Sequence, residues 1–313
     1  MQPARVRDVF AVDESVVAAL PGTKLSDGTS QQRYRTWRKR VGGEAGGDGV
    51  VEYLVPRVVI DVTGAPPEFM ARAGAGGSAD ELRRRVEELG PWEVPYRLAG
   101  GVSTMADDMV SAVAAARFWF RIEIVNGALA RLFGPELARA TALDVGCHSG
   151  LFSLDLAARG AARVDGVDLR AHNIAQARFA AEHYGVENVS FLVSDVDDLR
   201  ADEWDVVLNL GVLYHVLNPF ELIRRTHALC RSVAVIDTVC HTEPVSAFMV
   251  MGDKDVNRTS EGKAEFELHP TYRAVIDLMV DAGFSEIFEV VGRGDYVHDL
   301  YETGNRRCFL AIK

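Results

Sequence analysis

The chain has 313 residues, of which 48% are hydrophobic, and its 34 basic and 45 acidic side chains give a net charge of −11 at pH 7. This length allows one large domain or two smaller ones, and the acidic balance argues against an extended nucleic-acid footprint. No apolar run approaches the roughly 20 residues of a membrane-spanning helix, no signal peptide is expected, and four widely spaced cysteines favour a reduced, cytoplasmic setting.

The first part of the chain, residues 1–105, shows no single repeating pattern. A basic run at 31–40 precedes a glycine-rich stretch at 42–49, and residues 50–62 have strand character broken by Pro56. Ser78 and Glu81 form a capping box, which predicts a helix that continues through residue 89. The segment that follows, with Trp92 and Tyr96, is expected to be extended. We treat residues 1–105 as one N-terminal region.

A helical pattern occupies residues 107–133. Apolar side chains recur there at steps of three and four residues, which predicts a pair of amphipathic helices leading into the next region. We therefore place a domain boundary between 105 and 106. The second domain is predicted to cover residues 106–313, with leading helices at 106–135.

From residue 139 onward, predicted strands and helices alternate. The strands are expected at 141–145, 162–168, 188–193, 204–210, 232–239, 284–291 and 306–312, and the helices at 150–159, 171–184, 218–230 and 271–282. Such alternation predicts an α/β fold with a mostly parallel sheet covered by helices on both faces. The charged segment 245–269 interrupts the alternation and is expected to form a solvated flap.

A glycine-rich turn follows the first of these strands and reads Asp144-Val145-Gly146-Cys147-His148-Ser149-Gly150. Such a turn brings backbone N–H groups and a helix N-terminus close to a ligand. Asp168 ends the second strand, where a carboxylate can accept both hydroxyls of a ribose. The dinucleotide fingerprint would need a second glycine after Gly146, and Asp144 would repel a pyrophosphate. The pattern therefore favours a cationic cofactor that contains adenosine, and disfavours NAD.

These residues resemble the glycine-rich motif of the class I S-adenosylmethionine-dependent methyltransferases. Asp144, Gly146, Gly150 and Asp168 match that motif, whereas His148 stands where many members have glycine. The resemblance covers residues 141–313 and implies a Rossmann-like, seven-stranded sheet with an antiparallel last strand. It implies S-adenosyl-L-methionine as the cofactor, and it implies the cofactor-binding residues Asp144, Gly146, His148, Gly150, Asp168, Leu169, Asp195, Val196, Asn209 and Leu210.

The fourth strand of this region leads into Gly211-Val212-Leu213-Tyr214-His215. This string resembles the branch that holds the tRNA wobble-uridine carboxymethyltransferase and small-molecule relatives from natural-product pathways. Ligands of open α/β sheets bind beyond the carboxyl ends of the strands. His215 is therefore a candidate general base and Tyr214 a candidate for orienting the acceptor, with helix capping and packing as their structural alternatives.

Candidate acceptor-binding residues come from three other segments of the chain: they are Trp92, Tyr96, His241, Glu243 and Tyr272. Ordinary core packing is the alternative for the aromatic ones. The group Cys240, His241 and Glu243 lacks ordinary ligand spacing, so no metal site is predicted. One arginine of the pair 306–307 is a candidate for binding a substrate carboxylate, although a surface role is favoured.

The combined motifs predict methyl transfer to a small-molecule acceptor in secondary metabolism. Residues 1–105 are expected to serve as a lid and to build much of the acceptor pocket. The alternatives are a tRNA-modifying alkyl transferase, an NAD-dependent oxidoreductase and a non-catalytic cofactor-binding module. A nucleic-acid partner is disfavoured by the charge and no membrane partner is expected, whereas a homodimer stays open.

Overall fold

The computed structural model describes residues 3–13, 55–71, 77–105, 112–200, 204–243, 245–252, 266–294 and 297–313. The basic run at 31–40, the glycine-rich stretch at 42–49 and the charged centre of the expected flap at 253–263 lie outside the described residues. No helix in the described ranges is long and apolar enough to cross a membrane.

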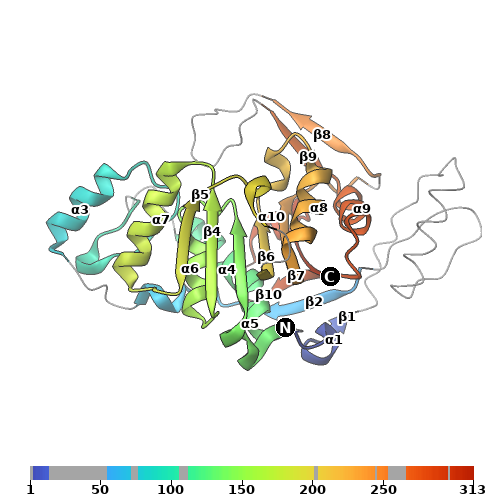
Figure 1. The fold of residues 1–313 in the computed structure, drawn as a ribbon, viewed down its shortest axis with the longest axis horizontal. Coiled ribbons are helices and arrows are strands. Elements are labelled where there is room, and N and C mark those ends of the chain that lie inside the picture. The colour runs from blue at the N-terminus through green and yellow to red at the C-terminus, as the bar shows by residue number, and fades with distance from the viewer. Residues whose placement is uncertain are drawn as a thin grey trace, which may run out of the picture.

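A nine-stranded sheet forms the centre of the molecule, in the order β1-β2-β10-β11-β7-β6-β3-β4-β5 (Figure 1). Seven of its strands correspond to the seven expected from the sequence: β3 (Thr141–Val145), β4 (Arg163–Asp168), β5 (Val189–Val193), β6 (Trp204–Leu210), β7 (Cys230–Val239), β10 (Glu286–Arg293) and β11 (Arg306–Ile312). The last strand, β11, is antiparallel to both β7 and β10. The predicted α/β, Rossmann-like sheet with an antiparallel last strand is therefore confirmed.

The N-terminal region adds the two remaining strands, β1 (Val12–Asp13) and β2 (Arg57–Asp61). Strand β2 lies parallel to β10, with Val58 opposite Val290, and β1 pairs antiparallel with β2. Val58 and Ile60 alternate with more exposed neighbours, so this strand contributes one apolar face to the core. Residues from both sides of the expected boundary at 105 thus share one sheet.

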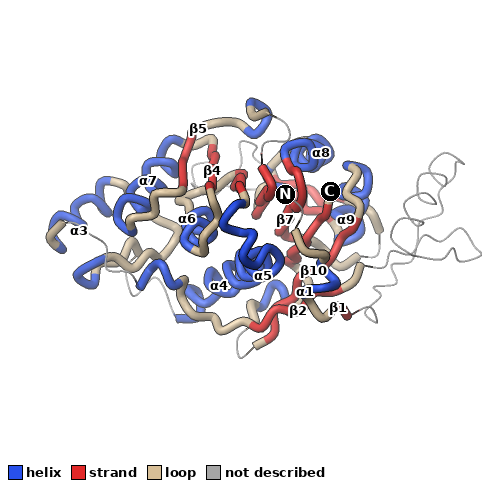
Figure 2. The backbone as a smooth tube through the Cα atoms, turned by 60° about the horizontal axis from the view of Figure 1, so that its bottom comes forward, coloured by secondary structure: helices blue, strands red, loops and turns tan. Residues whose placement is uncertain are grey.

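Helices cover both faces of the sheet (Figure 2). One face packs against α4 (Ala112–Ile122), α5 (Ala128–Phe133), α6 (Leu151–Ala158) and α7 (Ala171–Tyr184), whereas α8 (Pro219–Leu229) and α9 (Tyr272–Ala282) cover the other. Alternate residues of a strand face opposite sides: in β7, Val233 and Val235 pack with the first group and Ala234 and Ile236 with the second. The remaining helices are α1 (Val6–Val9), α3 (Ala79–Glu88) and α10 (Asp299–Glu302).

The ends of the expected flap form a hairpin rather than a solvated loop. Strand β8 (Phe248–Met251) pairs antiparallel with β9 (Glu267–Pro270), so that Met251 lies opposite Glu267. The charges in the middle of this segment led to the prediction of a loop, and the two short flanking strands were not predicted. The hairpin matters for function because β9 brings Glu267 and His269 to the site described next.

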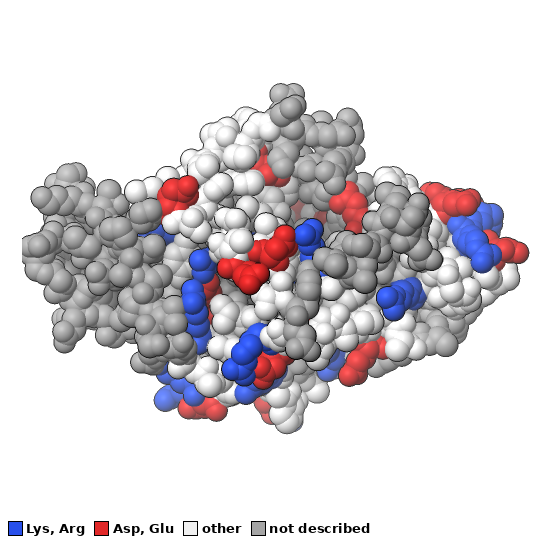
Figure 3. Space-filling model, turned by 180° about the vertical axis from the view of Figure 1, so that it is seen from behind, with Lys and Arg blue, Asp and Glu red and all other residues white. Residues whose placement is uncertain are grey.

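The face seen in Figure 3 carries described basic and acidic side chains close to one another. Its described residues form no continuous basic surface in this view. This distribution agrees with the acidic balance of the whole chain.

Candidate active site

A cavity of about 1210 Å³ opens at the carboxyl ends of the parallel strands. This is the edge at which open α/β sheets bind their ligands. Its walls come from the loops after β3, β4, β5 and β6, from β9, from the start of β11, and from Glu93, Val94, Phe118 and Arg121 of the N-terminal part of the chain. The cavity is larger than the roughly 300–1,000 Å³ of an ordinary small-molecule site. It therefore has room for two ligands side by side.

Two glycines make the turn after β3 possible. Gly146 and Gly150 have φ angles of 68° and 83°, which side chains of L-residues rarely tolerate. A Cβ atom on Gly146 would lie 2.6 Å from Val212, and one on Gly150 would lie 2.7 Å from the ring of Phe191. The turn can thus pass close to its neighbours, with Gly146 on the cavity wall and Gly150 behind it at the start of α6.

His148 adopts a left-handed backbone conformation, with a φ angle of 52°. This conformation costs a non-glycine residue about 1–2 kcal/mol, which accounts physically for the glycine that related motifs carry at this place. The backbone N–H of His148 donates a hydrogen bond to Asp168 at 3.0 Å. That bond joins the turn after β3 to the end of β4, and it offsets part of the strain. His148 also lines the cavity.

Asp168 is a centre of hydrogen bonding at the cavity wall. One carboxylate oxygen accepts from His148, and the other accepts from the N–H of Arg170 at 2.8 Å and from the side chain of Asn173 at 3.2 Å. These bonds fix the orientation of the carboxylate at the cavity wall. The neighbouring Leu169 is 47% exposed and also lines the cavity.

Asp195 and Val196 follow β5 on the same wall. The side chain of Asp195 accepts a hydrogen bond from the backbone N–H of Asp197 at 3.2 Å and so begins a short helical turn at residues 196–198. The capping role considered from the sequence is therefore present. Asp195 keeps a place on the cavity wall as well, so capping and ligand binding are compatible here.

Asp144 is buried at the end of β3 and accepts a hydrogen bond from the Ser153 hydroxyl at 2.6 Å. Burial raises the pKa of Asp144 to about 7, opposed by the Ser153 bond and reinforced by the charge of Asp168. A nearby cation would stabilise the charged form of such a buried carboxyl group. The residues at this end of the cavity therefore fit a ligand with a ribose and an ammonium group.

Tyr214 and His215 lie at the other end of the cavity, together with Glu267 and His269 of β9. The Tyr214 ring lies 4.2 Å from the His215 ring and 5.4 Å from the His269 ring, measured between centroids. Glu267 is 3% exposed. Its two oxygens lie 3.1 Å from His215 Nδ1 and 2.5 Å from His269 Nε2. One buried carboxylate therefore lies within contact distance of two imidazole rings.

The structure brings together ten of the residues proposed from the sequence on one cavity wall: Asp144, Gly146, His148, Asp168, Leu169, Asp195, Val196, Leu210, Tyr214 and His215. Asn209 is fully buried instead, and its amide donates to the Thr226 hydroxyl of α8 at 3.1 Å. Gly150 shapes the turn without lining the cavity.

The residues proposed for acceptor binding lie outside the cavity wall. The indole of Trp92 donates to the Val86 carbonyl, and the Tyr96 hydroxyl donates to the Ser149 carbonyl at 2.7 Å, so that Tyr96 supports the glycine-rich turn from behind. Tyr272 packs on Phe309. Glu243 is exposed. The His241 ring lies 5.7 Å from that of His269, behind the cavity wall.

Four residues of the wall escaped the sequence argument or were misjudged by it. Glu267 and His269 were hidden in the expected flap, although their spacing of two residues places both side chains on one face of a strand. Arg121 was hidden in an apolar helix pattern. Arg306, for which a surface role was favoured, is 7% exposed and lines the cavity. In the described ranges, no group of three His, Cys, Asp or Glu side chains is placed to hold a metal ion.

Comparisons with known proteins agree with this geometry. A family model described as a methyltransferase domain matches residues 142–233. The ubiquinone biosynthesis O-methyltransferase of Ruegeria pomeroyi is 29% identical over 170 residues, which span 52% of this chain and 68% of that enzyme. The ubiquinone biosynthesis O-methyltransferase of Xanthomonas euvesicatoria is 34% identical over 128 residues, which span 39% of this chain and 53% of that enzyme.

Among solved structures, the N-terminal domain of EvdMO1 with SAH bound is similar in fold, with a TM-score of 0.54 and 21% identity. The similarity covers 75% of this chain and 96% of that domain. The fold is that of a Rossmann-like protein with a large cavity at the carboxyl edge of its parallel strands. With the family match, the chain is a class I S-adenosylmethionine-dependent methyltransferase. Its cofactor is S-adenosylmethionine, and its reaction is methyl transfer.

Proposed function

We propose that this enzyme methylates a hydroxyl group of a small-molecule acceptor in secondary metabolism, with His215 as the general base and Tyr214 as the residue that orients the acceptor. The observation that carries the proposal is the contact of the buried Glu267 with His215 and His269 at the cavity wall. A hydroxyl is a weak nucleophile until its proton is removed, whereas an amine needs less assistance. A carboxylate-supported histidine is therefore suited to a hydroxyl acceptor.

The acidic half of the cavity provides the cofactor site in this proposal. Asp168 accepts the ribose hydroxyls, Asp195 and the N–H of Val196 contact the adenine, and Asp144 with the glycine-rich turn holds the amino acid portion. Leu169 and Leu210 supply apolar contacts at the wall. When bound there, the cofactor supplies an electrophilic methyl group. Side chains of the protein bind and position the acceptor and remove its proton.

His215 is placed to accept a proton through Nε2. Its Nδ1 lies 3.1 Å from Glu267 Oε1, so the charge of the carboxylate favours a proton on Nδ1 and Nε2 keeps its lone pair. When His215 takes the proton of the acceptor hydroxyl, the negative charge of Glu267 stabilises the imidazolium that forms. Positioning of the acceptor in line with the methyl group supplies the rest of the rate.

A small-molecule acceptor is favoured by the size and the lining of the cavity. Its volume exceeds what one ligand of ordinary size fills, and apolar residues such as Val212, Val216 and Leu217 form the wall beside Tyr214. The matched relatives from Ruegeria and Xanthomonas are O-methyltransferases of ubiquinone biosynthesis, which act at oxygen, as proposed here. Phe118 and Arg121 on the cavity wall support a lid role for part of the N-terminal half of the chain.

The test is transfer of a labelled methyl group from S-adenosylmethionine to three classes of acceptor: catechols, aromatic amines and bulk tRNA. We expect methyl ethers of catechols as the products. Methylated amines with unreacted catechols would contradict the hydroxyl assignment, and labelled tRNA would contradict the small-molecule assignment. Calorimetry with S-adenosylhomocysteine, run on the same preparation, establishes that the protein tested binds its cofactor product.

A further inference from the structure

A buried cluster of two arginines around one carboxylate lies beside the proposed acceptor site. Asp237 of β7 is fully buried, and its Oδ1 accepts hydrogen bonds from Arg306 Nε at 2.8 Å, from Arg306 Nη2 at 2.5 Å and from Arg121 Nη2 at 2.8 Å. The Tyr301 hydroxyl donates to Oδ2 of the same carboxylate. The three partners of Asp237 come from α4, α10 and β11.

The charges of this cluster do not balance. Two guanidinium groups face one carboxylate, and the arginines keep the pKa of Asp237 below its ordinary value despite burial. Burial holds the pKa of Tyr301 well above its ordinary value, so this phenol is neutral and acts as a donor. The hydrogen-bonded groups of the cluster therefore carry one positive charge in excess, and Asp144, which also interacts with Arg121, offsets it only in part near neutral pH because its pKa is raised to about 7. Such a charge, withdrawn from water at 18% and 8% side-chain exposure, is costly unless an anion joins it.

Donors of both arginines are left over for such an anion. Arg121 Nε is buried and has no hydrogen-bond partner within the described residues. Arg306 uses Nε and Nη2 on Asp237, which leaves Nη1 without a bond to any described side chain. Both residues line the cavity. Guanidinium groups that present unused N–H donors suit the two oxygens of a carboxylate.

The position of Arg306 points to the acceptor rather than to the adenosine end of the cavity, whereas Arg121 lies 5.1 Å from the centre of the Phe152 ring and acts electrostatically on Asp144. A Cβ atom on Gly211, at the exit of β6, would lie 3.2 Å from Arg306 Nη2 and 3.5 Å from the Tyr214 hydroxyl. Arg306 is therefore a close neighbour of Tyr214, which stands next to the proposed base. Asp168 and Asp195, by contrast, stand on the loops after β4 and β5.

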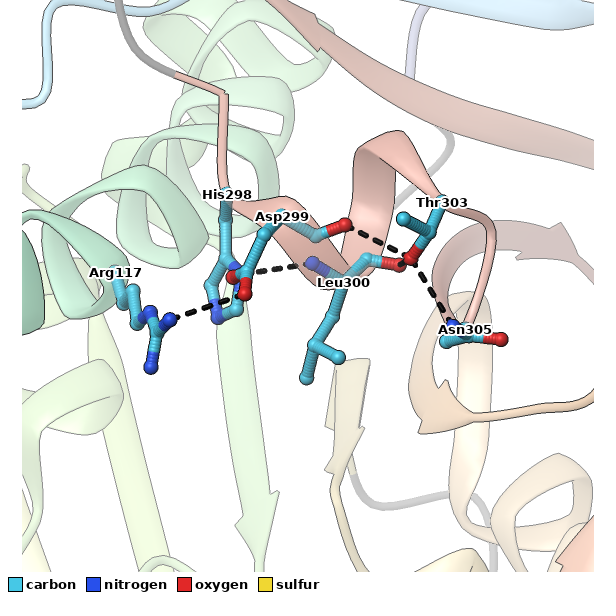
Figure 4. A network of polar contacts seen from close by, with 6 residues as sticks. All are labelled: Arg117, His298, Asp299, Leu300, Thr303 and Asn305. Atoms are coloured by element: carbon cyan, nitrogen blue, oxygen red, sulfur yellow. Dashed lines mark hydrogen bonds and ion pairs between the residues drawn. The ribbon is translucent and has the colours of Figure 1, made fainter.

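A second polar network joins residues of α4, of α10 and of the segment just before β11 (Figure 4). Arg117, one helical turn before Arg121 on α4, pairs with Asp299 at 3.0 Å. Asp299 begins α10, its carbonyl accepts from the Thr303 hydroxyl at 2.9 Å, and Thr303 accepts from Asn305, next to Arg306 in sequence. These contacts connect the elements that carry Arg121, Tyr301 and Arg306. The position of the two arginines is thus supported by the fold around them.

We propose that Arg121 and Arg306 form a subsite that binds a carboxylate group of the acceptor, and that the acceptor is therefore an anionic hydroxylated small molecule. This inference rests on the proposed function, because it assigns a substrate class to the same cavity. The methionine portion of the cofactor also carries a carboxylate, so the experiment must separate these two sources.

The probes are protocatechuate, a catechol with a carboxylate, and its uncharged amide, protocatechuamide. Binding of each is measured by calorimetry to the full chain saturated with S-adenosylhomocysteine. We expect the wild-type enzyme to bind the carboxylate about tenfold or more tightly than the amide, as for a hydrogen-bonded charge. In Arg306→Gln and Arg121→Gln this preference is lost, while the affinity for S-adenosylhomocysteine stays within about twofold. In Arg306→Lys the preference is intermediate, because the charge remains and the planar fork is gone.

The matched control is Arg293→Gln, since Arg293 is 72% exposed and pairs with Asp61 at the surface. Equal affinities of the wild-type enzyme for the two probes would overturn the proposal. It would also be overturned if the arginine variants lost affinity for S-adenosylhomocysteine but not for methylthioadenosine, since the cluster would then bind the cofactor carboxylate. Thermal unfolding checks each variant. If Arg306→Gln does not fold, Arg121→Gln decides the outcome, because it leaves Asp237 paired with Arg306.

These outcomes differ from a failure of the proposed function. If S-adenosylhomocysteine binds and the carboxylate preference depends on Arg306, the subsite stands even where no methyl ether forms. If methyl ethers form equally on both probes, and the two probes bind with equal affinity, the proposed function stands and the subsite does not.

Discussion

Glu267 Oε1 lies 3.1 Å from His215 Nδ1 in the cavity wall, although the two residues come from different parts of the fold. His215 follows β6 of the main sheet, and Glu267 belongs to the separate β8–β9 hairpin. The hairpin therefore completes the proposed base rather than only covering it. The backbone fixes this relationship through His241, whose N–H donates to the Pro270 carbonyl at 2.9 Å and joins the end of β9 to the loop after β7.

Replacement of Glu267 tests whether this carboxylate positions the base. We expect Glu267→Gln to lower kcat by about 10- to 100-fold, because the imidazolium formed on His215 loses its counter-charge. The acidic limb of the pH–rate profile should move to lower pH, since a lone imidazole is a weaker base. Glu267→Asp should recover part of the activity. A lower kcat with an unshifted pH profile would indicate a purely structural role for Glu267.

Replacement of Asp168 tests the cofactor site. We expect Asp168→Ala to weaken the binding of S-adenosylhomocysteine by roughly 1–3 kcal/mol, because bonds to the ribose are lost. Loss of the bond to the His148 N–H also frees the strained turn. Asp198→Ala is the matched control, because Asp198 is exposed and does not line the cavity. Calorimetry gives both affinities, and an unchanged value in Asp168→Ala would remove this residue from the site.

The raised pKa of Asp144, about 7, predicts two opposite pH effects. In the protein without ligand, the folded state favours the protonated carboxyl. The free energy of unfolding therefore falls as the pH rises from the ordinary value of 3.8 toward about 7. The ammonium group of a bound ligand favours the charged carboxylate, so the affinity for S-adenosylhomocysteine should increase over the same upper part of this range. Both effects should be absent in Asp144→Asn, as measured by chemical unfolding and by calorimetry. An identical pH dependence in the variant and the wild type would exclude Asp144 as their origin.

Local patterns were enough to predict the order of the seven main strands along the chain and ten residues that line the cavity. Periodicity located the strands from β3 to β11, and the spacing of Asp144, Gly146 and Asp168 located the turn, because these features depend on neighbours in sequence. The hairpin was missed because β8 and β9 are short and flank a charged stretch. Glu267 becomes functional only through contact with His215, which no local pattern encodes.

The same reasoning explains why three aromatic residues proposed for acceptor binding do not line the cavity and why a surface role was wrongly favoured for Arg306. Aromatic side chains often line pockets, but they pack equally well in a core. The three aromatic candidates, Trp92, Tyr96 and Tyr272, are all buried in the core. Arg306 looked like a surface residue because arginine usually is one. Its burial depends on Asp237, a strand neighbour distant in sequence, together with Arg121 from α4.

His215 and His269 share Glu267, and separate replacements determine which ring takes the proton. We expect His215→Ala to lower turnover by about 10²- to 10⁴-fold while the affinity for S-adenosylhomocysteine stays nearly intact, because a general base contributes this much. His269→Ala should have a smaller effect, since Glu267 still supports His215. His227→Ala is the matched control, because this histidine of α8 contacts Phe284 and does not line the cavity.

Comparison of the His215→Ala and His269→Ala variants also separates base catalysis from positioning. Turnover of His215→Ala within about threefold of the wild type would contradict the base assignment, since it falls far below the usual general-base effect. A large loss in His269→Ala with a small one in His215→Ala would move the base to His269. A large loss in both would mean that the two rings act as a unit through Glu267, and the double variant would then lose no more than either single one. Single-turnover rates with a catechol acceptor distinguish these results, because they report the chemical step without product release.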